Sequence, residues 1–338
     1  MSKKSSLSYV LMFLLTLVLM VGCGSTNKQP TDVEVDHENV TSDSHQDNEE
    51  EEEIVLEDTV KMVTDHLDRE VEITGEPERV IALTRAYIEE LFELGVTPVA
   101  KVEEYNNRPE GVELPSVSNQ SKPDIEAIYA LEPDLIIANS RQHSDILDLL
   151  VESGAPVFFV NPNIVEEDPL TDRIKLFGEL LGKEDVAEEY ITHLNTVSDE
   201  LKETVAGYGY ETGLMIQGGV ESIEVAMPTG LYGALLMRLG IENIIPANLP
   251  GAGQSTWVSY DFETILSEDP DVIIVRAAGG GGTSADELLA YYKENPMWQD
   301  LTAIKEDKIF VLPARVNPGN ISNEDALKVT VQSITPNE

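Results

Sequence analysis

A fifteen-residue pattern that occurs twice constrains the fold of this chain more than any other feature. The segment DIEAIYALEPDLIIA begins at Asp124 and DFETILSEDPDVIIV begins at Asp261; aligned without gaps, 137 positions apart, they share seven of fifteen residues. Each predicts an Asp N-cap, a short helix, a Pro-Asp turn and a buried strand. Convergence on common helix–strand chemistry is one explanation. We favour the other, two lobes of similar plan.

Short apolar runs alternate with helical segments along the rest of the chain. RVIAL, VAKV, DLIIA and VFFV predict buried strands, whereas AYIEELFELG and SDILDLLVESG predict helices that end at glycine. This alternation predicts an α/β fold with mostly parallel strands.

The segment from Pro169 to Val205 holds no convincing strand. Gly182 is expected to interrupt it, and from Asp185 onwards apolar residues recur on one helical stripe. About 20 residues of helix reach about 30 Å, enough to cross between lobes as a rigid connection. We therefore predict two similar α/β lobes joined by a single long helix, with a ligand cleft between them. The predicted boundaries are 59–168 for the N-terminal lobe, 169–206 for the linker and 207–338 for the C-terminal lobe.

The N-terminus carries the features of an export signal. Basic residues precede the apolar run Leu7–Val21, and Gly22 and the chain's only cysteine, Cys23, follow it. A permanent membrane helix needs about 20 apolar residues, and this run is shorter. MVGC resembles a bacterial lipobox, although Met20 stands where the motif usually has Leu. The resemblance implies that residues 1–22 are a signal peptide and that a lipid on Cys23 anchors the protein to the outer face of the cell membrane.

Composition excludes several classes of function. Residues 23–58 include DNEEEEE and no aromatic residue, which predicts a disordered acidic tether. The net charge of −41 argues against nucleic acid as a partner, because phosphate binding needs a basic surface. We find no Ser-His-Asp, zinc or paired-carboxylate signature, so we expect a binding protein rather than an enzyme, with no cofactor and no metal site of its own.

Arginines follow several of the predicted strands. Arg85 comes after RVIAL, Arg141 after DLIIA, Arg276 after DVIIV and Arg315 after IFVL. Ligands of open α/β sheets gather outside the carboxyl ends of the strands. Guanidinium groups suit carboxylates, catecholates and other planar anions, so these loops predict an anion-binding cleft. The alternative for each arginine is an ion pair that only holds its loop.

The whole arrangement resembles the substrate-binding proteins of ABC importers for ferric siderophores, cobalamin and haem. The resemblance covers essentially all of residues 58–334. VTDHLDREVEITGEPERVIAL is similar to the opening hairpin and first strand of that family, with Asp68 where Gly is usual, and the two repeated segments match its helix–turn–strand units. With the contacts that the resemblance implies, the candidate ligand-binding residues are Arg85, Tyr87, Gln120, Arg141, Met227, Trp257, Arg276 and Arg315.

The resemblance also implies partners. Similar glutamates in the family dock into arginine pockets on the permease, which assigns that role to Glu126 and Glu263; the alternative is that each carboxylate only favours its helix N-terminus. We expect a monomeric extracytoplasmic lipoprotein that delivers an anionic ferric siderophore or iron–carboxylate complex to an ABC importer, with the iron coordinated by the chelator. Haem is the alternative cargo, with Tyr87 or Met227 as axial ligand. Cobalamin is less favoured, since that branch often has aromatic residues where this chain has Gln120 and Ser140.

Overall fold

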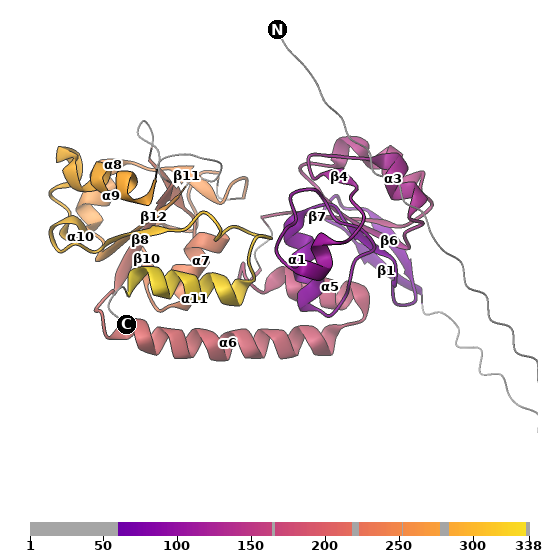
Figure 1. Ribbon diagram of the computed structural model, residues 1–338, viewed down its shortest axis with the longest axis horizontal. Coiled ribbons are helices and arrows are strands. Elements are labelled where there is room, and N and C mark those ends of the chain that lie inside the picture. Colours follow the sequence, from indigo (N-terminus) through magenta and orange to yellow (C-terminus); the bar gives the residue numbers. More distant parts are fainter. Residues whose placement is uncertain (1–59, 164–165, 218–222, 252, 278–283, 336–338) are drawn as a thin grey trace, which may run out of the picture. The chain divides into compact units, whose positions relative to one another are not determined.

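The computed structural model describes residues 60–163, 166–217, 223–251, 253–277 and 284–335. Cys23, the predicted signal peptide and the predicted tether lie outside these residues. The described part is an α/β protein with one parallel and one mixed sheet of three or more strands (Figure 1). Within it, no helix has the length and apolar character that a membrane crossing needs.

The N-terminal half, residues 60–163, is built on a parallel sheet. Its strand order is β3 (Val80–Ala82), β6 (Leu135–Asn139) and β7 (Val157–Val160), and all three strands are buried. The preceding hairpin pairs β1 (Val60–Thr64) with β2 (Glu70–Thr74). Its turn places Asp68 at φ 59°, the left-handed region that favours glycine. The other elements of this half are α1 (Arg85–Glu93), α2 (Pro109–Val112), β4 (Ser118–Asn119), β5 (Lys122–Pro123), α3 (Ile125–Ala130), η1 (Ser144–Ile146) and α4 (Leu147–Val151).

Two helices follow this half, as the sequence predicts. α5 (Asp172–Leu181) ends at Gly182, which adopts φ 66°, and α6 (Glu184–Ala206) runs for 23 residues. At about 1.5 Å per residue, α6 is about 35 Å long. Ala187 near its start packs into the core of the N-terminal half, whereas Leu194 and Val205 pack into the core under the second sheet. α6 therefore contacts both halves, and Figure 1 shows it running beneath α5 and α11.

The C-terminal half, residues 207–335, is built on a mixed sheet. Its order is β11-β9-β8-β12-β13, with β10 also paired to β8. The pairings of β8 with β10 and β12, and of β12 with β13, are parallel, whereas β9 is antiparallel to both of its neighbours. The strands are β8 (Thr212–Gln217), β9 (Glu224–Ala226), β10 (Glu242–Asn243), β11 (Trp257–Ser259), β12 (Val272–Arg276) and β13 (Ile309–Leu312). The helices are α7 (Leu231–Arg238), α8 (Phe262–Glu268), α9 (Ala285–Glu294), η2 (Pro296–Trp298), α10 (Thr302–Lys305) and α11 (Asn323–Ile334).

The repeated segments form the same local structure in both halves. Asp124 caps α3 by accepting a hydrogen bond from the Ala127 amide (3.1 Å), and Asp261 caps α8 by accepting one from the Thr264 amide (2.9 Å). The second aspartates also correspond. Asp134 accepts from the Glu78 amide (2.8 Å) just before β3, and Asp271 accepts from the Thr212 amide (2.8 Å) in β8. Each thus ties its strand to the neighbouring strand, and the predicted cap, helix, turn and strand are confirmed.

One predicted strand is absent. Residues 99–102, VAKV, form only an isolated bridge between Lys101 and Ser116. The Lys101 amide donates to the Pro115 carbonyl (2.8 Å), and the Val117 amide donates to the Lys101 carbonyl (2.9 Å). The partner segment contains Pro115, which has no N–H to donate, so the ladder cannot lengthen into a sheet.

Candidate functional site

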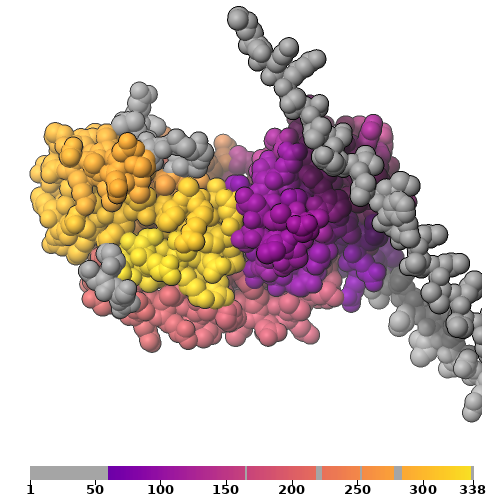
Figure 2. All heavy atoms as spheres, in the orientation of Figure 1, coloured from indigo at the N-terminus to yellow at the C-terminus, as the bar shows by residue number. Residues whose placement is uncertain are grey.

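A pocket with polar and apolar lining lies where segments from both halves meet. Its volume is about 270 Å³. The residues after β3, β6 and β7 supply one side of it, and the segments 229–232 and 317–323 supply the other, with further lining from α5 and α6. Figure 2 shows the C-terminal atoms, in yellow, directly against the N-terminal half, in indigo. On its N-terminal side, the pocket thus lies just past the carboxyl ends of parallel strands.

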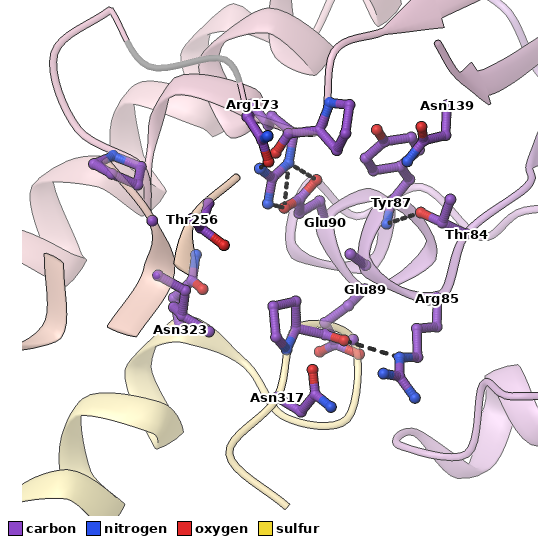
Figure 3. Close-up of a pocket in the computed structure, with 18 of the residues that line it drawn as sticks. Thr84, Arg85, Tyr87, Glu89, Glu90, Asn139, Arg173, Thr256, Asn317 and Asn323 are labelled. Atoms are coloured by element: carbon purple, nitrogen blue, oxygen red, sulfur yellow. Dashed lines mark hydrogen bonds and ion pairs between the residues drawn. The ribbon is translucent and has the colours of Figure 1, made fainter. Parts of the chain in front are cut away.

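Arg85 and Tyr87, both predicted, line this pocket from the start of α1 (Figure 3). The Thr84 hydroxyl caps the helix by accepting from the Tyr87 amide (3.3 Å), which fixes Arg85 in the first turn. The Tyr87 side chain is only 2% exposed, and its hydroxyl donates to the Val160 carbonyl (3.3 Å). Burial raises the pKa of Tyr87, so its phenol stays neutral at physiological pH.

Gln120, the third predicted residue at the pocket, is held by a histidine. His143 is fully buried; its Nδ1 accepts from the Asn139 amide (3.0 Å), and its Nε2 lies 2.6 Å from the Gln120 carbonyl oxygen. Since the Asn139 amide can only donate, the proton is on Nε2, and Nε2 donates to Gln120. Burial lowers the pKa of His143, which keeps the ring neutral. His143 thus positions two pocket residues, a role that a lone histidine in the sequence does not reveal.

An ion pair that the sequence analysis missed forms one wall. The Arg173 guanidinium donates to both oxygens of Glu90, with Nε at 2.9 and 3.1 Å, and both residues line the pocket (Figure 3). Burial opposes the charge of Arg173, but the Glu90 carboxylate outweighs it and raises the Arg173 pKa above its ordinary value. Arg173 lies in the first turn of α5, where no strand-end rule points to it.

Further carboxylates lie along α1. Glu89 accepts from the Arg108 Nε (2.9 Å) and from the Tyr105 hydroxyl (2.7 Å), and Arg108 also pairs with Glu93. Burial raises the pKa of Glu93 to about 7, and the negative charges of Glu89, Glu324 and Asp325 add to this shift. The pocket therefore presents carboxylates as well as guanidinium groups.

Arg276 lies just behind the lining rather than in it. Its Nε donates to the Tyr232 hydroxyl (2.6 Å) and its Nη1 donates to Gln217 (2.9 Å), which links it to Glu224. With the Asn317 carboxamide turned so that its oxygen faces the arginines, this oxygen lies 3.3 Å from Arg276 Nη2 and 3.2 Å from Arg85 Nη2. Neither Arg85 nor Arg276 forms an ion pair with any carboxylate of the described residues.

The other candidates lie elsewhere. Arg141 and Arg315 are exposed and do not line the pocket. Met227 is fully buried in a hydrophobic core of the C-terminal half, and Trp257 packs beside Tyr232 with ring centroids 5.1 Å apart. Their predicted contacts with ligand stay predictions.

Several polar atoms at the pocket have no hydrogen-bond partner among the described residues. Within that part of the chain, Asn163 Nδ2 and Thr229 Oγ1 are buried without a hydrogen bond, and the Tyr190 hydroxyl, beside Asn323, makes none of normal geometry. All of these residues line the pocket. A buried polar group without a partner costs roughly 1–3 kcal/mol, so these atoms favour a ligand rich in hydrogen-bonding groups.

The predicted docking residues lie on the surface. Glu126 is in the first turn of α3 and Glu263 is in the first turn of α8, and both are exposed. Within the described residues, no cluster of His, Cys, Asp and Glu has the arrangement of a metal site.

Segments from both halves converge on one pocket, an arrangement suited to holding a ligand, and the comparison with known families identifies the class. Residues 80–316 match the model of the periplasmic binding protein family. The chain belongs to this family. Its members are binding proteins rather than enzymes, as the sequence analysis expected.

Individual relatives are distant but similar over most of their length. The Fe(3+)-citrate-binding protein YfmC of Bacillus subtilis is 24% identical over 246 residues, which cover 70% of this chain and 74% of that protein. The putative ABC transporter substrate-binding lipoprotein YhfQ of the same organism is 26% identical, over 69% of this chain and 75% of YhfQ. Among solved structures, Staphylococcus aureus SirA complexed with staphyloferrin B superposes with a TM-score of 0.64, at 21% identity over 80% of this chain and 97% of SirA.

Proposed function

We propose that this protein is the extracytoplasmic binding lipoprotein of an ABC importer and that it captures an anionic ferric chelate, either a siderophore or an iron–carboxylate complex. The chelator coordinates the iron, and the protein holds the chelate between two lobes of similar plan, residues 59–168 and 207–338. The lipid on Cys23 keeps the protein at the membrane, where Glu126 and Glu263 contact the permease.

The observation that carries this proposal is the pair formed by Arg85 and Arg276. They come from opposite halves, both face the Asn317 carboxamide oxygen once that group is turned towards them, and lack a carboxylate counterion within the described residues. Guanidinium groups that converge without a counterion favour a planar anion. The family match and relatives whose names state binding of ferric citrate support iron chelates as the cargo class.

Haem is less consistent with the pocket. The Tyr87 hydroxyl is committed to the Val160 carbonyl, and burial raises its pKa, which disfavours the phenolate that would bind iron. The other suggested axial ligand, Met227, is fully buried in the core.

Intrinsic tryptophan fluorescence tests the proposal. Trp257 packs on the pocket residue Tyr232, so an occupied pocket should quench its emission. The panel is ferric citrate, ferric siderophores of catecholate, hydroxamate and carboxylate types, haemin and cobalamin. We expect saturable quenching by at least one anionic ferric chelate. Quenching by haemin alone, with a sharp Soret band, would replace this proposal by haem transport.

A further inference from the structure

The turn Asn317–Asn320, which follows β13 and leads into α11, presses against the start of α1. The Asn320 amide donates to the Asn317 carbonyl (2.9 Å), and Pro318 and Gly319, with φ 76° at Gly319, fit a type II turn. A Cβ on Gly319 would lie 2.4 Å from the carbonyl carbon of Arg85. Only glycine permits this approach, so Gly319 allows the turn to pack directly against the start of α1.

The turn supplies hydrogen-bond acceptors to Arg85 and Arg276, which have no carboxylate partner in the part of the chain that the structure describes. The Pro318 carbonyl accepts from Arg85 Nε (3.1 Å), the hydrogen bond drawn as a dashed line in Figure 3. With the Asn317 carboxamide turned as described above, opposite to its orientation in the figure, its oxygen lies between Arg85 Nη2 and Arg276 Nη2. Tyr232 and Gln217 hold the other nitrogens of Arg276. Asn317 lines the pocket and Arg276 does not, so the turn stands between the ligand space and Arg276.

We propose that the turn Asn317–Asn320 is a built-in competitor for the ligand. Asn317 supplies a neutral oxygen at the position between Arg85 and Arg276, and an anionic oxygen of the cargo displaces it. This inference rests on the proposed function, because it identifies what the cargo must displace. A carboxylate or catecholate oxygen makes stronger, charge-assisted bonds to guanidinium than an amide oxygen does, so an anion can displace the turn.

The competition has a consequence for selectivity. The apparent affinity of a ligand is its intrinsic affinity multiplied by the fraction of ligand-free molecules whose turn is already displaced, so it is low when this fraction is small. A neutral chelate would exchange one neutral acceptor for another and gain little from Arg276. The turn therefore favours cargo with a free anionic oxygen.

Binding of ferric citrate tests the competition. Asn317→Ala should tighten ferric citrate by about five- to tenfold, the effect of losing one competing bond to a charged group. A neutral ferric trihydroxamate should change much less. Asn317→Asp, which supplies a competing carboxylate, should weaken ferric citrate by about tenfold. In the Arg276→Ala background, Asn317→Ala should give a smaller gain, because the shared contact is already lost.

A matched control separates this contact from a general effect of the substitution. The Asn195 carboxamide oxygen also accepts from a guanidinium, Arg238 Nη1 (2.9 Å), but Arg238 already pairs with Asp168 (2.7 Å) and Asn195 does not line the pocket. Asn195→Ala and Asn195→Asp should leave ferric citrate binding unchanged. Unchanged or weaker binding by Asn317→Ala would overturn the inference.

The ligand-free protein gives an independent result. Asn317→Asp should raise the melting temperature by about 2–4 °C, because its carboxylate neutralises two unpaired guanidinium groups. Asn195→Asp should not raise the melting temperature, and adding Arg276→Gln to Asn317→Asp should reduce the rise.

Iron-free citrate should stabilise Asn317→Ala more than wild type. If neither the higher melting temperature of Asn317→Asp nor the greater stabilisation of Asn317→Ala by citrate is seen, the turn is not a competitor, even if ferric citrate binds. If no ferric chelate binds wild type but both effects appear, the proposed cargo is wrong and the competition with anions stands.

Discussion

At the scale of single residues, Arg85 and Arg276 are expected to dominate the affinity for an anionic cargo. A charge-assisted hydrogen bond contributes roughly 1.5–3 kcal/mol. Arg85→Ala and Arg276→Ala should therefore each weaken the best ferric chelate by about 10- to 100-fold in fluorescence titrations. Lys should restore more affinity than Gln at either position, but not all of it, because Lys lacks the planar fork. Arg315→Ala provides the comparison, since Arg315 is exposed outside the pocket lining; a similar loss of affinity there would support its own predicted ligand contact. Wild-type affinity in both pocket variants would contradict an anion site.

Glu93 should make binding depend on pH. Its pKa is raised to about 7, chiefly by burial, so its carboxylate is charged above this pH and neutral below it. Glu93 lines the pocket, and its negative charge disfavours an anionic ligand. Lowering the pH from 8 to 6 should tighten a chelate whose own charge is constant over this range by a few-fold. Glu93→Gln should abolish this dependence of affinity on pH. If the affinity of the variant changes with pH as much as that of wild type, another group is responsible.

The sequence predicted some of these side chains, and the reason is topological. Arg85 directly follows a recognisable strand, so a rule about strand ends finds it, whereas Gln120 was suggested by the family resemblance, which implies ligand contacts in the loop before the Asp124 helix. No such rule finds Arg173 and Asn317, because the first turn of α5 and a tight turn after β13 bring them to the pocket from distant positions in the sequence. Nor does the sequence show that Arg141 and Arg315 point into solvent, since orientation depends on loop conformations that no periodic pattern encodes.

At the scale of elements, the repeated helix–turn–strand segment was the most predictable part of the fold. Its caps, turn and buried strand are all local features, and both copies form as predicted. The antiparallel strand β9 was not anticipated, because a three-residue strand has too little pattern to reveal its direction. The strand predicted at residues 99–102 does not form, also for a reason that a local pattern cannot reveal. Its apolar pattern is local, whereas strand pairing depends on a partner segment that contains a proline.

The same repeat places matching carboxylates on two helices, and this gives a prediction for transport. Glu126 and Glu263 are exposed in the first turns of α3 and α8. If they dock on a cationic permease surface, Glu126→Ala and Glu263→Ala should leave chelate affinity and melting temperature nearly unchanged and reduce uptake of labelled chelate, most strongly in the double variant. Arg at both positions should reduce uptake further.

The alternative role of these glutamates predicts a different result. A carboxylate that only stabilises its helix N-terminus contributes about 0.3–1 kcal/mol, so its loss would lower the melting temperature slightly and leave uptake intact. The exposed Glu152, just after α4, provides a control substitution of the same type. Normal uptake by the double Ala variant, at equal surface abundance, would remove the docking assignment.

At the scale of the whole molecule, α6 limits how the two halves can move. It is a continuous helix of 23 residues with buried side chains in the cores of both halves. A large hinge motion would have to bend it or expose those side chains. We therefore expect small changes on cargo binding, such as displacement of the turn Asn317–Asn320, rather than wide domain closure. Small-angle scattering should give nearly equal radii of gyration with and without ferric chelate.

The predicted membrane anchor lies at the other end of the chain. The sequence predicts a lipid on Cys23 and a tether over residues 23–58, which as a random chain would span roughly 30–35 Å. Holding the binding protein this close to the permease raises its effective concentration there. Cys23→Ala should move the protein from membrane to soluble fractions and lower uptake, while purified protein binds chelate like wild type. Ser25→Ala, which leaves the cysteine in place, should behave as wild type. An intact mass showing wild-type protein at full length with an unmodified Cys23 would exclude the anchor.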